Sequence, residues 1–498
     1  MKHKREFREP TVWISIIPFA VLIGALVPVV KVFGADALEG GAQVALLFAS
    51  AVSVGLYMLV CRGKWSVLED AILNNIRMVS TGIIILLLIG AISGTWMISG
   101  IVPTFICYGI KLITPKIFLF ISCLICALVS VLTGSSWTTI ATIGVALLGI
   151  GTAQGYPASW VAGAIISGAY FGDKISPLSD TTTLAATSTG VHIFEHIRYM
   201  LRTTVPSFAI ALVIYLVMSL LHPSTEATHM EEYSTALRAS FNISPWVLIV
   251  PALTAVMIAR KCPAMVTLFC AALMAAVAAV ILQPQVIWSV ATGGALADYT
   301  SLGPVEAFRG TMLSIYSSTG IDTLNPELNE LVATKGITGM LNTVYLIIAA
   351  SVFGGVMMGS GMVKCLTMAM FRYIRKAASL VGSTVFTGLF CDIVTGDQYL
   401  SIILTGSLYK EFYEQKGYKA KLLSRSVEDS ATVTSVLIPW NSCGMTQATV
   451  LHVATLAYLP FCFFNLLSPL MSIIVALFTP ESEFLSKSST SELPKPEK

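Results

Sequence analysis

Apolar residues gather in long runs along most of this chain. Runs long enough to cross a membrane occur in ten places, near residues 11–30, 43–60, 80–101, 158–187, 204–221, 244–259, 264–283, 337–362, 431–450 and 455–479. A membrane-spanning helix needs about 20 mostly apolar residues. Two further apolar regions, 117–150 and 379–410, are each interrupted by a polar pentapeptide. The pattern predicts an all-α polytopic membrane protein, in which each interrupted region is a re-entrant hairpin or a pair of short spans.

The two interruptions are similar to one another. The first reads TGSSW at 133–137 and the second reads TGDQY at 395–399. Their glycines, Gly134 and Gly396, lie 262 residues apart. A glycine followed by polar residues is costly inside a membrane unless it is buried in protein or lines an aqueous cavity. The recurrence of such a break favours a functional reason for it.

Other landmarks recur at nearly the same separation. Pro177 in ISPLSD and Pro439 in LIPWNS are again 262 residues apart. The stretch GTWMISGIV (94–102) shares five of nine residues with GVMMGSGMV (355–363), at a separation of 261. Landmarks that recur at one spacing predict an internal repeat.

Each predicted repeat contains five spans besides its interrupted region. An odd number of spans makes the second copy enter the membrane from the opposite side, which is the inverted-topology architecture of many secondary transporters. The sequence therefore predicts two inverted-topology repeats of about five transmembrane helices, each with a broken or re-entrant hairpin whose tip approaches the other. The predicted boundaries are a cytoplasmic tail (1–10), the first repeat (11–222), an external linker (223–243), the second repeat (244–480) and a disordered cytoplasmic tail (481–498).

Composition and charge agree with a membrane protein. Hydrophobic residues make up 55% of the chain and charged residues 11%, with a mean hydropathy of +0.80, whereas a soluble domain carries about 25% charged residues. With the N-terminus placed inside, basic residues concentrate in predicted cytoplasmic segments, namely 62–77, 192–202, 364–376 and 410–425. This distribution predicts a multi-pass protein with both termini in the cytoplasm. The net charge of +3 lacks a long basic run, so no nucleic-acid partner is expected.

Metal and disulfide chemistry receive little support. The ten cysteines lie in or beside apolar runs, without the clustered spacing of a zinc or disulfide framework. The motif HIFEH (192–196) matches the H-x-x-E-H pattern of some zinc proteases, but it falls in a predicted short cytoplasmic loop without a third ligand. We expect no cofactor and no metal other than a transported ion. Trp96, Trp137 and Trp160 are interpreted as packing or interface residues.

The polar residues that accompany the breaks are the candidate binding site. Carbonyl and hydroxyl oxygens freed by a broken helix are hard ligands that suit a small cation. The first tip offers Ser135, Ser136, Thr138 and Thr139; the second offers Asp397 and Gln398; the broken span near 172–185 offers Asp173, Lys174, Ser176, Ser179 and Asp180; and its partner in the second half offers Asn441 and Ser442.

Four aspartates in apolar segments are candidate proton carriers, namely Asp173, Asp180, Asp392 and Asp397. A carboxylate at the membrane centre costs about 2.5–3.5 kcal/mol, so its presence there favours a function. A carboxyl group in apolar surroundings also exchanges a proton for a cation more readily near neutral pH. Structural alternatives are an Asp173–Lys174 pair, a helix cap at Asp180 and an interfacial water at Asp392. Glu428 and Asp429 precede the second broken span and are predicted at its inner mouth.

These stretches resemble the NhaC family of bacterial Na⁺/H⁺ antiporters. The similarity lies in TGSSWTTIATIGVALLGIG (133–151), GAIISGAYFGDKISPLSDTTTLAA (163–186), TGDQYLSIILTG (395–406) and PWNSCG (439–444). Lys335-Gly336-Ile337 departs from the Arg-Gly-Gly that is usual in that family. The resemblance implies exchange of cytoplasmic Na⁺ for external H⁺, driven by the proton gradient. It also implies inverted repeats with two hairpins and a homodimer whose transport domains move against a scaffold.

Other functions stay open at this point. Some members of the family take up malate with protons and expel lactate with Na⁺, and Lys174 with the hydroxyl-rich tips could bind such a carboxylate. A membrane hydrolase or receptor is disfavoured because no nucleophile–base set or accessory domain is evident. A channel is disfavoured because several buried acids suit stepwise exchange.

Overall fold

The computed structural model describes residues 7–33, 40–222, 227–260, 262–323, 329, 332–371, 374 and 376–485. Over these residues the chain is α-helical, apart from short 3₁₀ and π-helical segments, connecting loops and two isolated β-bridges. The ends of both predicted tails, 1–6 and 486–498, lie outside the described residues, as does 223–226 of the predicted linker.

The helices of the first half are α1 (Val12–Phe33), α2 (Gly41–Gly55), α3 (Trp65–Ile98), α4 (Ile101–Leu112), α5 (Phe118–Thr133), α6 (Ser136–Thr139), α7 (Val145–Ala153), α8 (Ala158–Ile175), α9 (Asp180–Thr189), α10 (Ile193–Leu221) and α11 (Ala227–Ser240). Those of the second half are α12 (Ile249–Ala259), α13 (Ala264–Leu282), α14 (Pro284–Thr292), α15 (Pro304–Tyr316), α17 (Leu341–Gly359), α18 (Met362–Phe371), α19 (Ala377–Thr395), α20 (Gln398–Gln415), α21 (Ala420–Val427), α22 (Ser442–Leu451), α23 (Thr455–Tyr458) and α24 (Phe463–Phe478).

The predicted all-α polytopic membrane fold is confirmed. Among the described residues, nine helical stretches are long and apolar enough to cross a membrane, and two bent helix pairs raise the number to eleven. One pair bends by 87° between Ser240 and Pro245, and the other by 57° between Phe461 and Phe463.

Two boundaries differ from the prediction. The span expected at 80–101 belongs to the 34-residue helix α3, which begins at Trp65 because the polar stretch before the apolar run is also helical. Residues 192–202 were expected as a loop, but His192 is the N-cap residue of α10 and 193–202 form its first turns. Hydropathy locates the apolar part of a helix and misses a polar extension of the same helix.

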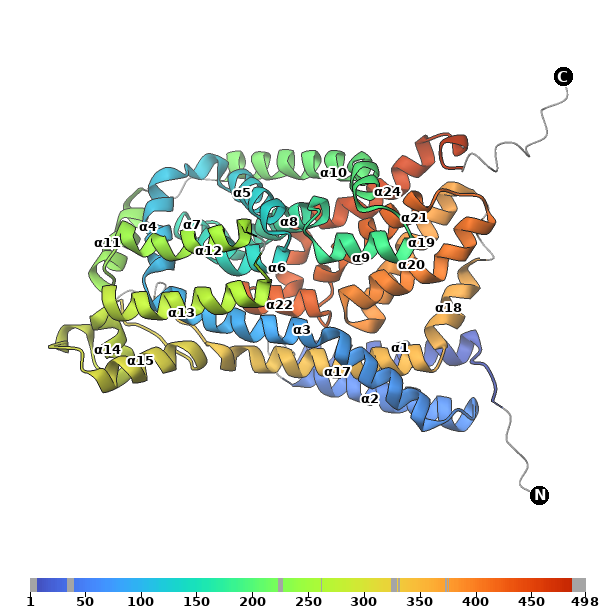
Figure 1. Ribbon diagram of the computed structural model, residues 1–498, viewed down its shortest axis with the longest axis horizontal. Helices are drawn as coiled ribbons and strands as arrows, with labels where there is room; N and C mark the ends of the chain where they lie inside the picture. Colours follow the sequence, from blue (N-terminus) through green and yellow to red (C-terminus); the bar gives the residue numbers. More distant parts are fainter. Residues whose placement is uncertain are drawn as a thin grey trace.

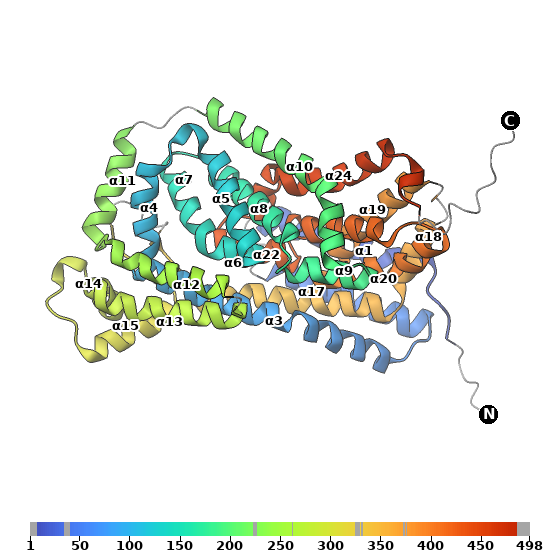
Figure 2. The ribbon, with the colours of Figure 1, turned by 45° about the horizontal axis from the view of Figure 1, so that its top comes forward.

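Segments from the two halves of the chain pack together. Helices α3 and α17 lie side by side along one side of the molecule, whereas α5, α8, α10 and α24 form the opposite side (Figures 1 and 2). The approach of α3 and α17 depends on Gly355, where a Cβ atom would lie 2.7 Å from the Cα of Ile72. Small residues allow this close packing of membrane helices.

The two interrupted regions end their first helices in the same way. Helix α5 ends at Gly134 with φ 67°, and α19 ends at Gly396 with φ 64°. This left-handed conformation is cheap only for glycine. The following residues, Ser135 and Asp397, are both extended and cap the next helix, since their side chains accept hydrogen bonds from a backbone N–H three residues on, at 3.2 and 3.0 Å.

Two threonines complete the matching geometry. The N–H of Ser135 donates to the Thr133 hydroxyl at 3.2 Å, and the N–H of Asp397 donates to the Thr395 hydroxyl at 3.1 Å. Each tip therefore turns the chain with the same local bonds, at residues 262 apart. The later breaks correspond as well, because Ser179 caps α9 and Asn441 caps α22. These bonds support a repeat in the local structure, while the opposite orientation of the two repeats stays a prediction.

Candidate functional site

A cavity of about 570 Å³ lies between the two hairpin tips. Five segments line it, namely part of α3, the first tip, the α8–α9 break, the α12–α13 connection and the start of α20. Five residues of the predicted site are on its wall: Ser135, Thr138, Asp173, Asp180 and Gln398. The tertiary structure thus brings both tips and the first broken span to one space.

Asp173 is fixed in the wall by three hydrogen bonds. Its Oδ2 accepts bonds from the backbone N–H and the hydroxyl of Ser136, at 3.1 and 2.6 Å. Its Oδ1 accepts a bond from the Ser179 hydroxyl at 2.6 Å. The residue is only 5% exposed. The first tip and the helix break therefore hold this carboxylate in one orientation, with lone pairs left for a ligand.

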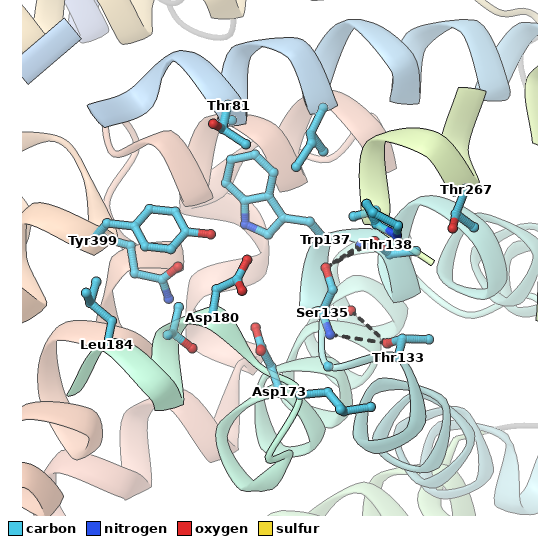
Figure 3. Close-up of a pocket in the computed structure, with 18 of the residues that line it drawn as sticks. Thr81, Thr133, Ser135, Trp137, Thr138, Asp173, Asp180, Leu184, Thr267 and Tyr399 are labelled. Carbon is cyan, nitrogen blue, oxygen red and sulfur yellow. Dashed lines mark hydrogen bonds between the residues drawn. The ribbon is translucent and has the colours of Figure 1, made fainter. Parts of the chain in front are cut away.

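Asp180 is the more accessible acid. It is exposed, lies in the cavity wall and makes no hydrogen bond to a described residue. Helix α9 begins at Asp180 itself and its cap is Ser179, so the alternative that Asp180 caps this helix is wrong. Figure 3 shows the carboxylates of Asp173 and Asp180 pointing into the same space, between the ring of Tyr399 and the side chain of Ser135.

The second hairpin tip contributes fewer side chains to the cavity wall than the first. Gln398 and Tyr399 reach the cavity, whereas Asp397 caps α20 behind it and accepts a 3.1 Å bond from the Ser442 hydroxyl. Asp392 is fully buried, and its Oδ2 accepts a 2.7 Å bond from the Thr434 hydroxyl.

The remaining predicted residues support the breaks. The Thr139 hydroxyl donates to the carbonyl of Ser135 at 2.9 Å, and the Ser176 hydroxyl donates to that of Val131 at 2.8 Å. Asn441 donates through its amide to the carbonyl of Asp392 at 3.1 Å. These bonds position the tips without placing the side chains in the cavity wall.

Lys174 does not line the cavity. Its ammonium group is fully buried, bonds the carboxylate of Asp429 and donates to the Ser468 hydroxyl at 2.7 Å. The alternative of an Asp173–Lys174 pair is therefore wrong, because Lys174 pairs with a residue from the other half of the chain. Glu428 and Asp429, predicted at the inner mouth of the second broken span, are both fully buried in the protein.

The Lys174–Asp429 pair is expected to contribute to the stability of the folded protein, which can be tested by substitution. Lys174→Met removes the closer basic partner of the buried Asp429 carboxylate and leaves Arg425 at 3.7 Å, so we expect a cost at the lower end of the roughly 3–5 kcal/mol typical of a broken buried pair. The double variant Lys174→Met/Asp429→Asn removes both charges and should recover much of that loss. Thermal unfolding of both proteins in detergent measures the difference. A double variant less stable than Lys174→Met would contradict the assignment.

Some lining residues were not anticipated. Trp137, expected as a packing residue, lies on the cavity wall, and so does Tyr399. Each is the aromatic last residue of its pentapeptide, TGSSW or TGDQY. This repeated aromatic residue could have indicated that both side chains belong to the site. Thr81 and Thr267 also line the cavity, but they lie in long apolar helices and no local pattern marks them.

Zinc chemistry finds no support among the residues that are described. They contain no group of three or more His, Cys, Asp or Glu side chains that could hold a metal ion. His196 is buried in α10, where its Nδ1 lies 2.9 Å from the Ser424 hydroxyl. His192 is exposed at the helix start.

Comparison with known proteins places the chain in a family. A sequence model described as "Na+/H+ antiporter family" matches residues 168–479. The chain is 34% identical over 431 residues to the Na(+)/H(+) antiporter NhaC of Bacillus subtilis (strain 168), covering 86% of this chain and 91% of that protein. It is also 33% identical to the Malate-2H(+)/Na(+)-lactate antiporter of the same organism, over 94% of this chain and 95% of that one.

A third relative is named for a different substrate. The chain is 30% identical to the Arginine/ornithine antiporter ArcD of Halobacterium salinarum (strain ATCC 700922 / JCM 11081 / NRC-1), over 94% of this chain and 92% of that protein. All three relatives are antiporters in name, and each match extends over most of both chains. The chain belongs to the NhaC-type Na⁺/H⁺ antiporter family.

Proposed function

We propose that this antiporter exchanges cytoplasmic Na⁺ for external H⁺, driven by the proton gradient, and that the cavity is its Na⁺ site. One observation favours a cation as the substrate bound in the cavity. The cavity wall holds the carboxylates of Asp173 and Asp180, and none of its described residues is a lysine or an arginine. An acidic cavity of this kind attracts a cation and repels an organic anion.

The geometry supports distinct roles for the two acids. Asp180 has no hydrogen bond to a described residue that must break before it binds a cation. Asp173 offers lone pairs from a fixed position. Neutral oxygens of Ser135, Thr138 and Gln398 are available from the same wall. Oxygen ligands of both kinds suit Na⁺, a small hard cation. Alternating access would expose this set first to one side of the membrane and then to the other.

A second candidate is exchange of malate and lactate. It is favoured by the similarity to the malate–lactate antiporter, which extends over 94% of the chain. Lys174, the cationic residue next to Asp173, is already bonded to Asp429 and lies outside the cavity wall. Among the described residues of the wall, a carboxylate substrate would therefore meet two aspartates and no lysine or arginine, so we favour Na⁺.

The deciding experiment uses the purified protein in liposomes that carry an acid-inside pH gradient and a pH-sensitive dye. We expect external NaCl to dissipate the gradient and choline chloride to leave it intact. Sodium lactate and malate are then supplied on opposite sides. A response that requires these organic acids, with none to NaCl alone, would contradict the Na⁺/H⁺ proposal and support the second candidate.

A further inference from the structure

Five ionisable side chains form a second polar region, which we call the buried ionic cluster. They come from α8, α10, α21 and the π-helical segment Glu428–Thr432, and all are 0% exposed: Lys174, His196, Arg425, Glu428 and Asp429. None of them is among the residues that line the cavity. A charged group is rarely buried to this degree unless it is paired or functional.

Pairing within the buried ionic cluster is incomplete. Lys174 and Asp429 bond each other, but Arg425 approaches Asp429 only to 3.7 Å and its nitrogens make no hydrogen bond to any residue that is described. Neither oxygen of Glu428 has a partner of hydrogen-bond geometry within that part of the chain, and the closest donor is the hydroxyl of Thr432, one helical turn on. The nearest ionisable contact of Glu428 is the Nε2 of His196 at 4.0 Å, an atom that is likewise without a partner among the described residues.

Unpartnered buried polar atoms are expensive, so their concentration here needs a reason. Each costs about 1–3 kcal/mol, and more when it is charged. Ordered water, strain or function usually accounts for such atoms. Glu428 also begins a π-helical segment, and such segments occur frequently at functional sites. A carboxyl group without a bound donor can gain or lose a proton without breaking a hydrogen bond.

The buried ionic cluster extends from the cavity wall toward the surface. At one end, Lys174 directly follows Asp173, which faces the cavity. At the other end, His196 directly follows Glu195, whose side chain is 55% exposed and bonds Lys421 at 2.9 Å. In the chain, the buried ionic cluster therefore adjoins a residue of the cavity wall through α8 and a surface residue through the start of α10.

We propose that Glu428, with His196 beside it, carries the transported proton on a site separate from the Na⁺ site in the cavity. The inference rests on the proposed Na⁺/H⁺ exchange. The proton enters from water at the α10 end and binds a Glu428 oxygen, forming only an O–H bond. The Lys174–Asp429 pair joins the two helical segments that carry the sites, since Lys174 follows Asp173 on α8 and Asp429 follows Glu428 in the π-helical segment.

The surroundings of Glu428 are consistent with a proton site. Packed against its segment are α9, α19, α20 and α24, besides α21. The buried charged and titratable groups on the elements around it are Tyr170, Asp173 and Lys174 on α8, His196, Tyr199 and Tyr215 on α10, Cys391 and Asp392 on α19, Tyr409 and Tyr413 on α20, Arg425 on α21, and Asp429 on its own segment, while Asp180 on α9 and Lys421 on α21 are more exposed. Lys174 and Arg425 offset Asp429 and an ionised Glu428, so the buried ionic cluster can be neutral overall.

The test separates proton movement from Na⁺ movement. Glu428→Gln keeps the shape of the side chain and removes its titration. We expect it to lower Na⁺-driven proton flux in liposomes about 100-fold, while ²²Na⁺/Na⁺ exchange, which moves no net proton, stays within about twofold of the unsubstituted protein. Unchanged proton flux with an unchanged pH profile would overturn the proposal. Loss of both modes in a protein that elutes as a folded species would overturn it too.

Two further variants sharpen the result. Glu411→Gln removes an exposed glutamate on α20 and should change neither exchange mode. Glu428→Asp keeps a carboxyl group and should transport protons with a shifted pH profile, which keeps the proposal testable if Glu428→Gln does not fold. An absence of Na⁺-driven proton flux in the unsubstituted protein would instead count against the proposed function.

Discussion

Asp180→Asn is expected to abolish Na⁺-driven proton flux while leaving the protein folded in the membrane. The carboxylate is exposed in the cavity and makes no hydrogen bond to the described residues, so an amide of the same shape breaks no contact. Truncating one partner of a buried charge pair costs roughly 2–5 kcal/mol, and the low end applies here because Asp180 is exposed to the cavity. At about 1.4 kcal/mol per factor of ten, the apparent affinity for Na⁺ should fall by about 30-fold or more.

The measurement is dye-reported proton flux and ²²Na⁺ exchange in liposomes, with size-exclusion elution as the test of folding. Both exchange modes should be lost, in contrast to Glu428→Gln, because Asp180 acts at the Na⁺ site. Asp298→Asn is the matched control, since Asp298 is exposed and outside the cavity wall. Normal Na⁺-dependent flux in Asp180→Asn would remove this residue from the site.

Gly134→Ala is expected to displace the first hairpin tip. Gly134 has φ 67°, and an added Cβ would lie 2.7 Å from the carbonyl carbon of Leu178 and 2.8 Å from its oxygen. The left-handed conformation alone costs about 1–2 kcal/mol for alanine. The overlap with backbone atoms cannot be relieved by a side-chain rotation. The tip must therefore move away from the α8–α9 break, and with it Ser136, which bonds Asp173.

A displacement of about 1 Å at a reacting centre can lower a rate about 100-fold, and we expect Na⁺-driven flux to fall to that extent. Gly293→Ala supplies the control, because Gly293 has φ 76° but no atom within 4 Å of an added Cβ. It reproduces the conformational strain without the overlap. Comparable flux in the two variants would show that contact between the tip and the break is not required.

The breaks were predictable because their causes are local. A glycine at each helix end, an extended capping residue and a threonine before the glycine are all encoded within five residues of the chain. The structure shows them with matching bonds at Ser135 and Asp397. The predicted site was less complete: Asp397 and Asn441 position a tip or a break and do not face the cavity, whereas Trp137 and Tyr399 do.

Sequence by itself determined that this chain is a bundle of membrane helices with two broken hairpins. A helix in contact with lipid needs a long apolar run, and a residue in the left-handed conformation is usually glycine. Both the membrane helices and the helix breaks can therefore be identified from short stretches of sequence. Only the tertiary structure decided which polar groups share a space. Asp173 and Lys174 are neighbours on α8, yet one faces the cavity and the other bonds Asp429, 255 residues away. Such pairings depend on how helices that are distant in sequence pack against one another. A local pattern of residues does not predict that packing.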